Sequence, residues 1–355
     1  MDNLLDLPRA EAEQRLARFM HEAGEPAYRA RQVADRLWRN PTASFADMTE
    51  LPVALRERLG ATFSLPRLAL DTRQRSSDGT EKFLFRLDDG EGIETVAIPE
   101  QNRLTLCISS QAGCALQCAF CATGAMGFAR NLRPFEIAGQ VREMLLLGIR
   151  PTNIVFMGMG EPLMNWQAVD VALSLLNDPG ALGIGARHIT VSTVGVLPGI
   201  QALAARPEQF RLALSIHAPT DALRQQLMPI NTKYPLADVI EAAKSFVRRV
   251  TFEYVLLGGV NDSPAQAEHL AALARKCGAF VNLIPLHPGG ALGFTPSSAK
   301  ATAAFAGTIR KRGVEVAIRK SRGVDISAAC GQLRVERLGR RSPRGAEQDR
   351  DVHVA

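Results

Sequence analysis

Three cysteines, Cys114, Cys118 and Cys121, stand close together in the phrase GCALQCAFC, with the spacing C-x3-C-x2-C. Three thiolates at this spacing can ligate three irons of a cubane cluster and leave the fourth iron without a protein ligand. An iron with an open position can bind a small molecule and pass it one electron, which is how S-adenosylmethionine (SAM) is cleaved to a 5′-deoxyadenosyl radical. The spacing therefore predicts a [4Fe–4S] cluster that acts on SAM.

A structural zinc site is the alternative interpretation of these cysteines. Such sites are closed by four protein ligands, commonly as two separated C-x2-C pairs. The sequence contains no second C-x2-C and no H-x3-H, so an open cluster is favoured. Phe120, directly before the third cysteine, is typical of a residue that shields a cluster or packs on adenine, and equally of a core residue.

Length and composition bound the kind of protein. The chain has 355 residues, of which 46% are hydrophobic, enough for one catalytic domain of barrel size and a smaller unit. No apolar run reaches about 18 residues, and the charged N-terminus does not resemble a signal peptide. We therefore expect a cytoplasmic protein with no membrane partner, in which six cysteines indicate metal or redox chemistry.

Positive charge is in excess, with a formal net charge of +6 and an isoelectric point near 9.2. This excess permits a nucleic-acid partner without establishing one. It is most visible near the C-terminus, where we expect a basic, disordered tail over residues 336–355.

The chain divides into regions of different pattern. Residues 1–64 have helical periodicity on a basic background and are predicted to form a small accessory domain that binds RNA. Residues 65–102 alternate in hydrophobicity between DG turns, which predicts a short β-meander. In residues 103–335 strands alternate with helices. The arginines of the first region that could meet phosphates are Arg29, Arg31, Arg36 and Arg39.

The alternating region predicts an α/β fold with a parallel sheet or barrel. Its candidate strands are NIVFMG, HITVSTVG, RLALSIHA, VTFEYVLL, FVNLIPLH and VEVAIRK. Chemistry on such a fold belongs at the C-terminal ends of the strands, and polar residues follow several of them. This convergence of strand ends is a stronger indication of a site than any single motif.

Taken together, the motifs resemble those of the RlmN/Cfr family of radical SAM RNA methyltransferases. The resemblance covers nearly the whole chain and is strongest in TLCISSQAGCALQCAFCATG, GMGEP, ITVSTVG, LALSIHAP and the C-terminal DISAACGQL. It implies a partial (β/α)6 TIM-like radical SAM barrel, a [4Fe–4S] cluster on Cys114, Cys118 and Cys121, and two SAM molecules per turnover.

The resemblance also implies a route by which carbon 2 of adenine, which is electron-poor, becomes methylated. One SAM methylates Cys330, and a second SAM yields the radical that takes hydrogen from this methyl group, so that the resulting methylene radical adds to the ring. Glu94 in GIETVAIPE matches the proton acceptor. Cys107 matches the resolving cysteine, which releases the RNA as a Cys107–Cys330 disulfide forms. From its strand alone, Cys107 would be taken for a buried core residue, and Glu94 for an exposed strand carboxylate.

Several strand ends match the SAM contacts of the family. These residues are Gly160, Glu161, Ser192, Ser215, Ile216 and His217. The chain departs from the family where asparagine is usual in IPWNP, because here the phrase is IPLHP and His287 takes that place. Imidazole can offer a donor and an acceptor as asparagine does, so a SAM contact by His287 remains the expectation.

The implied substrate is an adenosine in large-subunit ribosomal RNA and one in tRNA, with a flavodoxin-type electron donor and a monomeric enzyme. Three alternatives stay open. They are methylation at carbon 8, as in the Cfr branch; a paralogue that acts on another RNA, suggested by His287; and a non-catalytic RNA-binding protein with a structural metal. Cys107, Cys330 and Glu94 argue against the last of these.

Overall fold

The computed structural model describes residues 1–286 and 293–333, so that His287 and the predicted tail lie outside the described residues. The chain begins with a helical unit of α1 (Arg9–Glu22), α2 (Tyr28–Leu37) and α3 (Val53–Thr62). Helix α1 buries Ala12, Leu16 and Met20, which recur every four residues and so share one face. The unit also includes a short parallel pair, β1 (Asp2–Asn3) with β2 (Phe63–Ser64).

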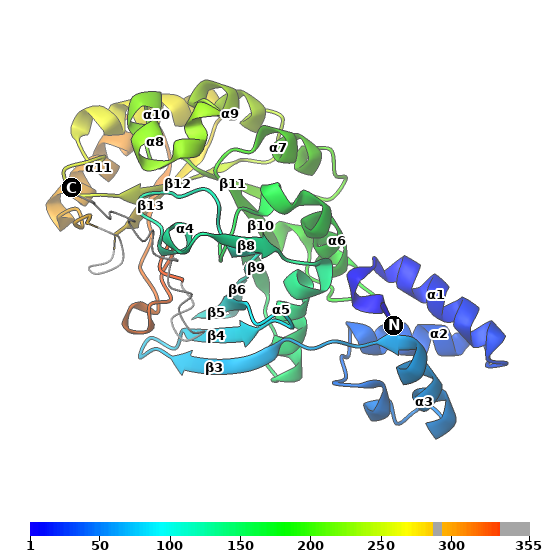
Figure 1. The fold of residues 1–355 in the computed structure, drawn as a ribbon. Coiled ribbons are helices and arrows are strands. Elements are labelled where there is room, and N and C mark those ends of the chain that lie inside the picture. The colour runs from blue at the N-terminus through cyan, green and yellow to red at the C-terminus, as the bar shows by residue number, and fades with distance from the viewer. Residues whose placement is uncertain (287–292, 334–355) are drawn as a thin grey trace, which may run out of the picture.

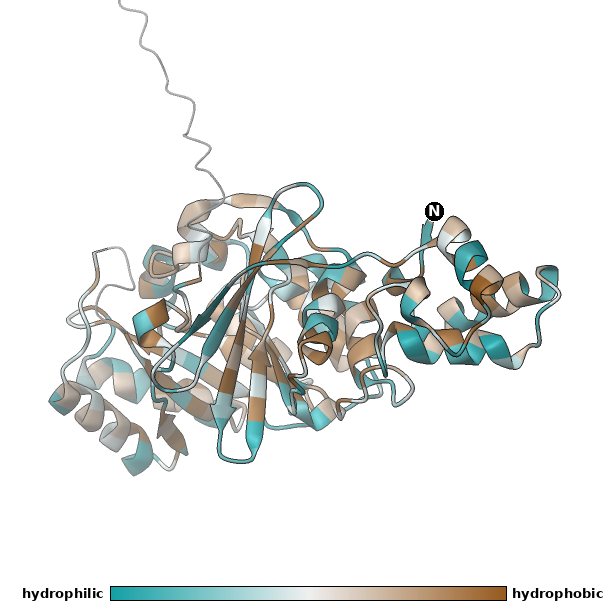
Figure 2. Ribbon diagram, turned by 90° about the horizontal axis from the view of Figure 1, so that it is seen from below, coloured by the Kyte–Doolittle hydropathy of each residue, from teal (hydrophilic) through white to brown (hydrophobic). Residues whose placement is uncertain are grey.

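The helical unit projects from one side of the molecule and is fixed to it by buried polar contacts (Figure 1). The fully buried Arg142 donates from Nε to the carbonyl oxygen of Leu37 at 2.8 Å and from Nη2 to that of Thr42 at 2.5 Å. These bonds satisfy carbonyl groups that end α2 and its following loop. Figure 2 shows hydrophilic residues along the outer sides of these helices.

One sheet of ten strands organises the rest of the described chain. In spatial order its strands are β14 (Val316–Ile318), β13 (Phe280–Pro285), β12 (Thr251–Leu256), β11 (Arg211–Ser215), β10 (Ile189–Thr193), β9 (Asn153–Phe156), β6 (Arg103–Cys107), β5 (Gly92–Glu100), β4 (Glu81–Arg86) and β3 (Ala69–Arg75). From β14 to β6 all neighbours are parallel, whereas β6, β5, β4 and β3 pair antiparallel. The six candidate strands of the sequence are confirmed as β9 to β14.

Helices connect the parallel strands and cover the outer face of the curved sheet (Figure 1). They are α5 (Pro134–Leu146), α6 (Trp166–Asn177), α7 (Leu197–Ala204), α8 (Asp221–Leu227), α9 (Leu236–Ala243), α10 (Pro264–Lys276) and α11 (Ala299–Lys311). Because β14 and β3 stay at opposite ends of the strand order, the described sheet is an open barrel. The predicted α/β partial barrel with a small helical N-terminal unit is therefore confirmed.

The antiparallel strands end the sheet with a charged edge. Strand β3 is exposed along almost its whole length and carries Asp71, Arg73 and Arg75. Charged side chains on an edge strand discourage pairing with other chains. In the described part of the chain, no helix is both long and apolar enough to cross a membrane.

Two short segments complete the inner side of the barrel. The hairpin of β7 (Gln111–Gly113) and β8 (Phe128–Asn131) frames the loop of the three cysteines, which ends in α4 (Ala122–Met126). After β14, the chain returns through the 3-10 turn η6 (Val324–Ile326) and runs on to Leu333. This C-terminal segment, residues 323–333, is the one that carries Cys330.

Candidate active site

A cavity of about 190 Å³ opens at the C-terminal ends of the parallel strands. Its wall follows from the alternation of side chains along the strands. On β12, for example, Glu253 and Val255 face the cavity, while the buried Phe252 and Tyr254 face the helices. The residues predicted from the sequence that line it are Cys107, Cys114, Cys118, Cys121, Gly160, Glu161, Ser192, Ser215, His217 and Cys330.

The loop of the three cysteines is shaped by its backbone. Gly113 has φ +76°, and a Cβ there would lie 2.0 Å from the carbonyl oxygen of Gly127, so the hairpin requires glycine at this position. Gln117 also has a positive φ, 52°, within the turn between the first two cysteines. The amide of Ala119 donates to the carbonyl oxygen of Leu227 at 2.9 Å, which ties the loop to α8.

The three thiols fit a cluster that keeps one open position. Cys114, Cys118 and Cys121 all reach the cavity wall, so a group bound to them would face the space left for a small molecule. Within residues 1–286 and 293–333, no three His, Cys, Asp or Glu side chains gather closely enough to hold a single metal ion. Burial raises the pKa of Cys114 to about 11 and also raises that of Cys118, so binding iron must displace protons.

Gly160 and Glu161 form the wall beside the cysteine loop. Gly160 has φ +98°, and a Cβ there would approach the Gln111 side chain to 2.5 Å. The carboxylate of Glu161 accepts from the amides of Leu163 at 3.1 Å and Val194 at 2.9 Å. Burial raises the pKa of Glu161 to about 7 against these hydrogen bonds. When charged, this carboxylate can accept hydrogen bonds from an ammonium group.

The imidazole of His217 is held in one orientation and in its neutral form, with a hydrogen to donate. It has φ +54°, and its Nδ1 accepts from the amide of Val255 at 3.0 Å, which leaves the ring proton on Nε2. Burial, reinforced by the charge of Arg224, lowers the pKa of His217 to about 3. Its ring meets Phe120 edge to face with centroids 4.7 Å apart. Ile216 is fully buried and is not part of the described cavity wall, unlike its neighbours.

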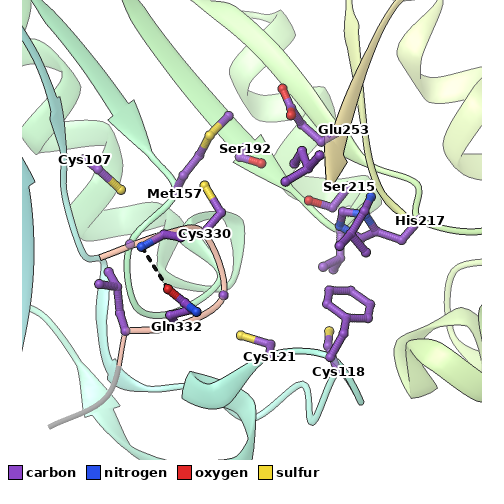
Figure 3. A pocket seen from close by; sticks show the side chains of 18 of the residues that line it. Cys107, Cys118, Cys121, Met157, Ser192, Ser215, His217, Glu253, Cys330 and Gln332 are labelled. Atoms are coloured by element: carbon purple, nitrogen blue, oxygen red, sulfur yellow. Dashed lines mark hydrogen bonds between the residues drawn. The ribbon is translucent and has the colours of Figure 1, made fainter. Parts of the chain in front are cut away.

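Cys107 and Cys330 come together from distant parts of the sequence (Figure 3). Cys107 ends β6 and is buried, which raises the pKa of its thiol to about 12. Cys330 is exposed within the cavity. Its segment is fixed to α4, because the amide of Ala122 donates to the carbonyl oxygen of Gly331 at 2.8 Å and Thr123 Oγ1 donates to that of Leu333 at 2.7 Å.

Glu94 does not reach the described cavity wall. It lies in β5 and is 3% exposed, so the interpretation as an exposed strand carboxylate is wrong. The reason is that Lys82 forms an ion pair with its carboxylate and that the ammonium group of Lys82 in turn contacts the carbonyl oxygen of Ser327 in the C-terminal segment. The carboxylate is therefore covered by Lys82 and by this segment.

Three charged residues of the cavity were missed by the sequence reasoning. They are Glu253, Arg319 and Arg322, and the Asn282 amide donates to Glu253 Oε2 at 2.8 Å. Glu253 lies in the candidate strand VTFEYVLL, Arg319 lies in VEVAIRK, and Arg322 follows VEVAIRK by two residues. A charged residue within a buried strand was the signal that could have found Glu253 and Arg319.

The chain is similar to known proteins along nearly its whole length. The family model of the radical SAM superfamily matches residues 108–271, and that of the ribosomal RNA large subunit methyltransferase N-terminal domain matches residues 2–65. A probable dual-specificity RNA methyltransferase RlmN from Gemmatimonas aurantiaca is 70% identical over 100% of this chain and 99% of its own length. This chain belongs to the RlmN family of radical SAM RNA methyltransferases.

Further relatives agree with this membership. A dual-specificity RNA methyltransferase RlmN from Anaeromyxobacter dehalogenans is 47% identical over 94% of this chain and 93% of its own length. The crystal structure of a radical SAM methyltransferase from Sphaerobacter thermophilus has a TM-score of 0.88 and 45% identity, covering 94% of this chain and 99% of that one. Membership implies a [4Fe–4S] cluster and SAM as the cofactors, so the interpretation of the cysteines as a zinc site is set aside.

Proposed function

We propose that this enzyme methylates carbon 2 of an adenosine in large-subunit ribosomal RNA and of an adenosine in tRNA, with Cys330 as methyl carrier. The observation that carries the proposal is the convergence of Cys330, Cys107 and the three cluster cysteines on one cavity. The printed names of the relatives, dual-specificity RNA methyltransferases, support two RNA substrates. The enzyme acts as a monomer and draws electrons from a flavodoxin-type reductant.

In this proposal the chain has three tasks around the cofactors. Cys114, Cys118 and Cys121 hold the cluster, which supplies the electron that cleaves SAM to a radical. The SAM contacts are Gly160, Glu161, Ser192, Ser215, Ile216, His217 and His287, of which His287 lies outside the described residues. Because Ile216 is fully buried, its part is played by its backbone.

Cys330 carries the carbon that is transferred. Its thiolate first accepts a methyl group from SAM and so becomes a thioether, from which a hydrogen atom is later removed. After the methylene radical adds to the adenine ring, the adduct would give up one electron to the cluster held by the three loop cysteines, and the carbon-2 proton passes to Glu94, which acts as a base. The Cys107 thiolate then bonds to the Cys330 sulfur as the bond from that sulfur to the methylene carbon breaks. This carbon takes up a proton and leaves with the RNA as its methyl group.

Glu94 can act as a base only when the structure around it opens. Lys82 donates from Nζ to the carbonyl oxygen of Ser327 at 3.5 Å, so the C-terminal segment 323–333 lies over the Glu94–Lys82 pair. We infer that entry of the target adenosine displaces this segment and exposes the carboxylate. An adenosine must in any case leave its stack before a radical can reach it.

The N-terminal helical unit is the proposed RNA-binding element. Of its four candidate arginines, Arg31 and Arg39 are exposed, whereas Arg29 and Arg36 are half-buried. Arg31 pairs with Glu13 at 3.4 Å, a surface contact that a phosphate can replace. Sequence-specific binding would then come from contacts to a splayed base near the cavity.

The decisive experiment is mass spectrometry of nucleosides from ribosomal RNA and tRNA incubated anaerobically with reconstituted enzyme, SAM and a reductant. We expect 2-methyladenosine from both RNAs. 8-Methyladenosine would place the enzyme in the Cfr branch, and SAM cleavage with neither product would indicate another RNA. Iron and sulfide near four each per chain must accompany the activity, and Cys330→Ala must retain both while losing methylation.

A further inference from the structure

A guanidinium group meets the methyl-carrying sulfur in the cavity. Arg319 donates from Nη1 to Cys330 Sγ at 3.2 Å, and this arginine is one of the three charged cavity residues that the sequence reasoning missed. It follows directly on β14, and its amide donates to the carbonyl oxygen of Leu283 at 2.8 Å. The backbone of Arg319 is therefore fixed by the sheet, while Cys330 lies on a segment outside it.

The register of three neighbouring strands brings a carboxylate to the same face. Glu253 on β12 is opposite Asn282 on β13, and Asn282 is opposite Ala317 on β14. Arg319 lies two residues beyond Ala317 and so points to the same side of the sheet. The charges of Glu253 and Arg319 act on each other, and the Asn282 amide holds the Glu253 carboxylate at 2.8 Å. Burial raises the pKa of Glu253 and the charge of Arg319 opposes that rise, so the carboxylate in its charged form stabilises the guanidinium at the cavity wall.

The same guanidinium also acts on the resolving thiol. The positive charge of Arg319 opposes the rise that burial and Cys330 cause in the pKa of Cys107. The pKa of Arg319 itself is raised, chiefly by the Cys330 sulfur and against burial. Other charged or titratable groups on the cavity wall are the cluster thiols, Glu161, His217 and Arg322.

We propose that Arg319 is a positioning residue for the two reacting thiols, which holds the Cys330 sulfur in the cavity and balances the negative charge of whichever thiol ionises. This inference rests on the proposed function of Cys330 as methyl carrier. In the methylation step the thiol proton has left to solvent, and the Cys330 sulfur then attacks the SAM methyl carbon. The new carbon–sulfur bond forms as the bond to the sulfonium breaks, and that electron pair leaves with S-adenosylhomocysteine.

The proposal gives Arg319 two tasks in sequence. Before methylation, the guanidinium holds the Cys330 sulfur and balances the negative charge of its thiolate, which is the nucleophile. The methylated sulfur is a neutral thioether that holds the guanidinium only weakly, so the positive charge becomes available to Cys107. The residue that helps to load the methyl group thereby also supports the thiolate that later releases the RNA.

The test is alkylation of individual cysteines in enzyme reconstituted with iron and sulfide, with SAM and RNA omitted so that Cys330 stays unmethylated. Iodoacetamide is added at pH 7.5, and peptide mass spectrometry follows Cys330, with the half-buried Cys277 as an internal reference. Arg319→Gln should slow alkylation of Cys330 roughly tenfold, as expected for loss of a cation in contact with a thiolate. Arg319→Lys should restore part of the rate, and Cys277 should not change.

Arg322→Gln is the matched control, because it removes a positive charge from the same cavity wall without removing the donor to Cys330. Equal slowing by Arg319→Gln and Arg322→Gln, or no slowing by Arg319→Gln, overturns the proposal. Iron content and circular dichroism report whether the variants fold.

If Arg319→Gln does not fold, the wild-type enzyme provides the test. Cys330 must then prefer the anion iodoacetate over neutral iodoacetamide more strongly than a short neutral cysteine peptide does, and an equal preference overturns the proposal. Since neither assay requires RNA, a negative result leaves the proposed function to be judged separately by the methylated nucleoside.

Discussion

The carboxylate of Glu94 forms an ion pair with the ammonium group of Lys82, with Oε1 and Nζ 3.0 Å apart. Both side chains are almost fully buried, at 4% and 10% exposed. The family resemblance gives Glu94 the role of a base, yet in this state a cation and the segment that carries Cys330 cover it. Removing only one partner of a buried ion pair is costly, because the charge that remains is still desolvated and no longer has an opposite charge beside it.

Lys82→Met is therefore expected to destabilise the protein by about 3–5 kcal/mol, the range for removing one partner of a buried pair. Lys82→Arg should cost much less, and the double variant Lys82→Met with Glu94→Gln should recover most of the loss. Urea unfolding of the three variants measures this. A Lys82→Met protein as stable as the wild type would show that the pair does not contribute to stability.

Removal of the resolving thiol should trap an intermediate. In Cys107→Ala the methylene can still bond to adenine, but no thiol can attack the Cys330 sulfur, so protein and RNA should stay covalently joined. Denaturing gels with labelled RNA would show a slow band that ribonuclease removes. Cys277→Ala, which changes a cysteine outside the cavity, should show no such band; release of free methylated RNA by Cys107→Ala would refute the disulfide step.

The C-terminal segment is also anchored on the side away from the cysteine loop. Asp78, in the turn between β3 and β4, accepts from the amide of Gly323 at 3.0 Å, and Asp325 accepts from the amide of Ser77 at 3.1 Å. Gly323 has φ +62°, and a Cβ there would lie 2.7 Å from that of Ala328, so this entry to the segment is closely packed.

Asp78→Ala should consequently loosen residues 323–333. Hydrogen exchange of their amides is expected to quicken by about tenfold, which corresponds to the loss of a hydrogen bond worth roughly 1–1.5 kcal/mol. Methylation of Cys330 should slow in parallel. Asp88→Ala, in the exposed turn between β4 and β5, is the matched control. Unchanged exchange in Asp78→Ala would show that the cysteine-loop contacts alone hold the segment.

The sequence predicted the parallel strands well, because each is a short apolar run between turns and helices. Local pattern also predicted that the polar residues at the ends of several strands would converge, since parallel strands end on one side of a sheet, and Ser192, Ser215 and Glu161 do meet in the cavity wall. It did not predict that Glu94 would be buried. The burial of Glu94 depends on Lys82 from the neighbouring strand and on a segment more than two hundred residues later in the chain.

Arg319 illustrates the same limit of local pattern. In the phrase VEVAIRK it resembles any basic residue after a strand, and only the register of β12, β13 and β14 brings it to the cavity. The assignment of Cys107 and Cys330 came from resemblance to a family, since a strand cysteine and an exposed cysteine have no chemical pattern of their own. Their common cavity is a property of the fold.

The N-terminal arginines should differ in their contribution to RNA binding. Arg31 and Arg39 are exposed, whereas Arg36 pairs with Glu50 at 3.1 Å and Arg29 donates to Gln32 and to a backbone carbonyl. Each lost phosphate contact lowers the salt slope of binding by about one. Arg31→Gln with Arg39→Gln should thus weaken binding and flatten its salt dependence.

The matched control is Arg29→Gln with Arg36→Gln, which removes the same amount of positive charge from two side chains that already bind other groups of the protein. Binding to tRNA would be titrated at several salt concentrations for both double variants. Equal slopes for the wild type and the Arg31/Arg39 variant would exclude the N-terminal unit as the main phosphate contact.

The buried His217 should make the stability of the apoprotein sensitive to acid. Its pKa is about 3 in the folded state because of burial and the charge of Arg224, whereas an unfolded chain has about 6.5. The unfolded state therefore binds the proton more tightly. The contribution of His217 to the free energy of unfolding is complete above pH 6.5 and is lost as the pH falls from 6.5 toward 3. A protonated imidazole also carries a hydrogen on Nδ1, so Nδ1 of His217 can then no longer accept the hydrogen bond from the Val255 amide.

Between pH 7 and pH 5, His217 should cost the wild type about 2 kcal/mol of unfolding free energy, at roughly 1.4 kcal/mol per pH unit below 6.5. His217→Gln should be less stable at pH 7 yet lose less on acidification, because no imidazole remains to be protonated. His269→Gln, on the exposed side of α10, should follow the wild type. Urea midpoints at pH 5, 6 and 7 decide the matter, and parallel curves for the wild type and His217→Gln would show that the ring is already protonated or solvated in the folded protein.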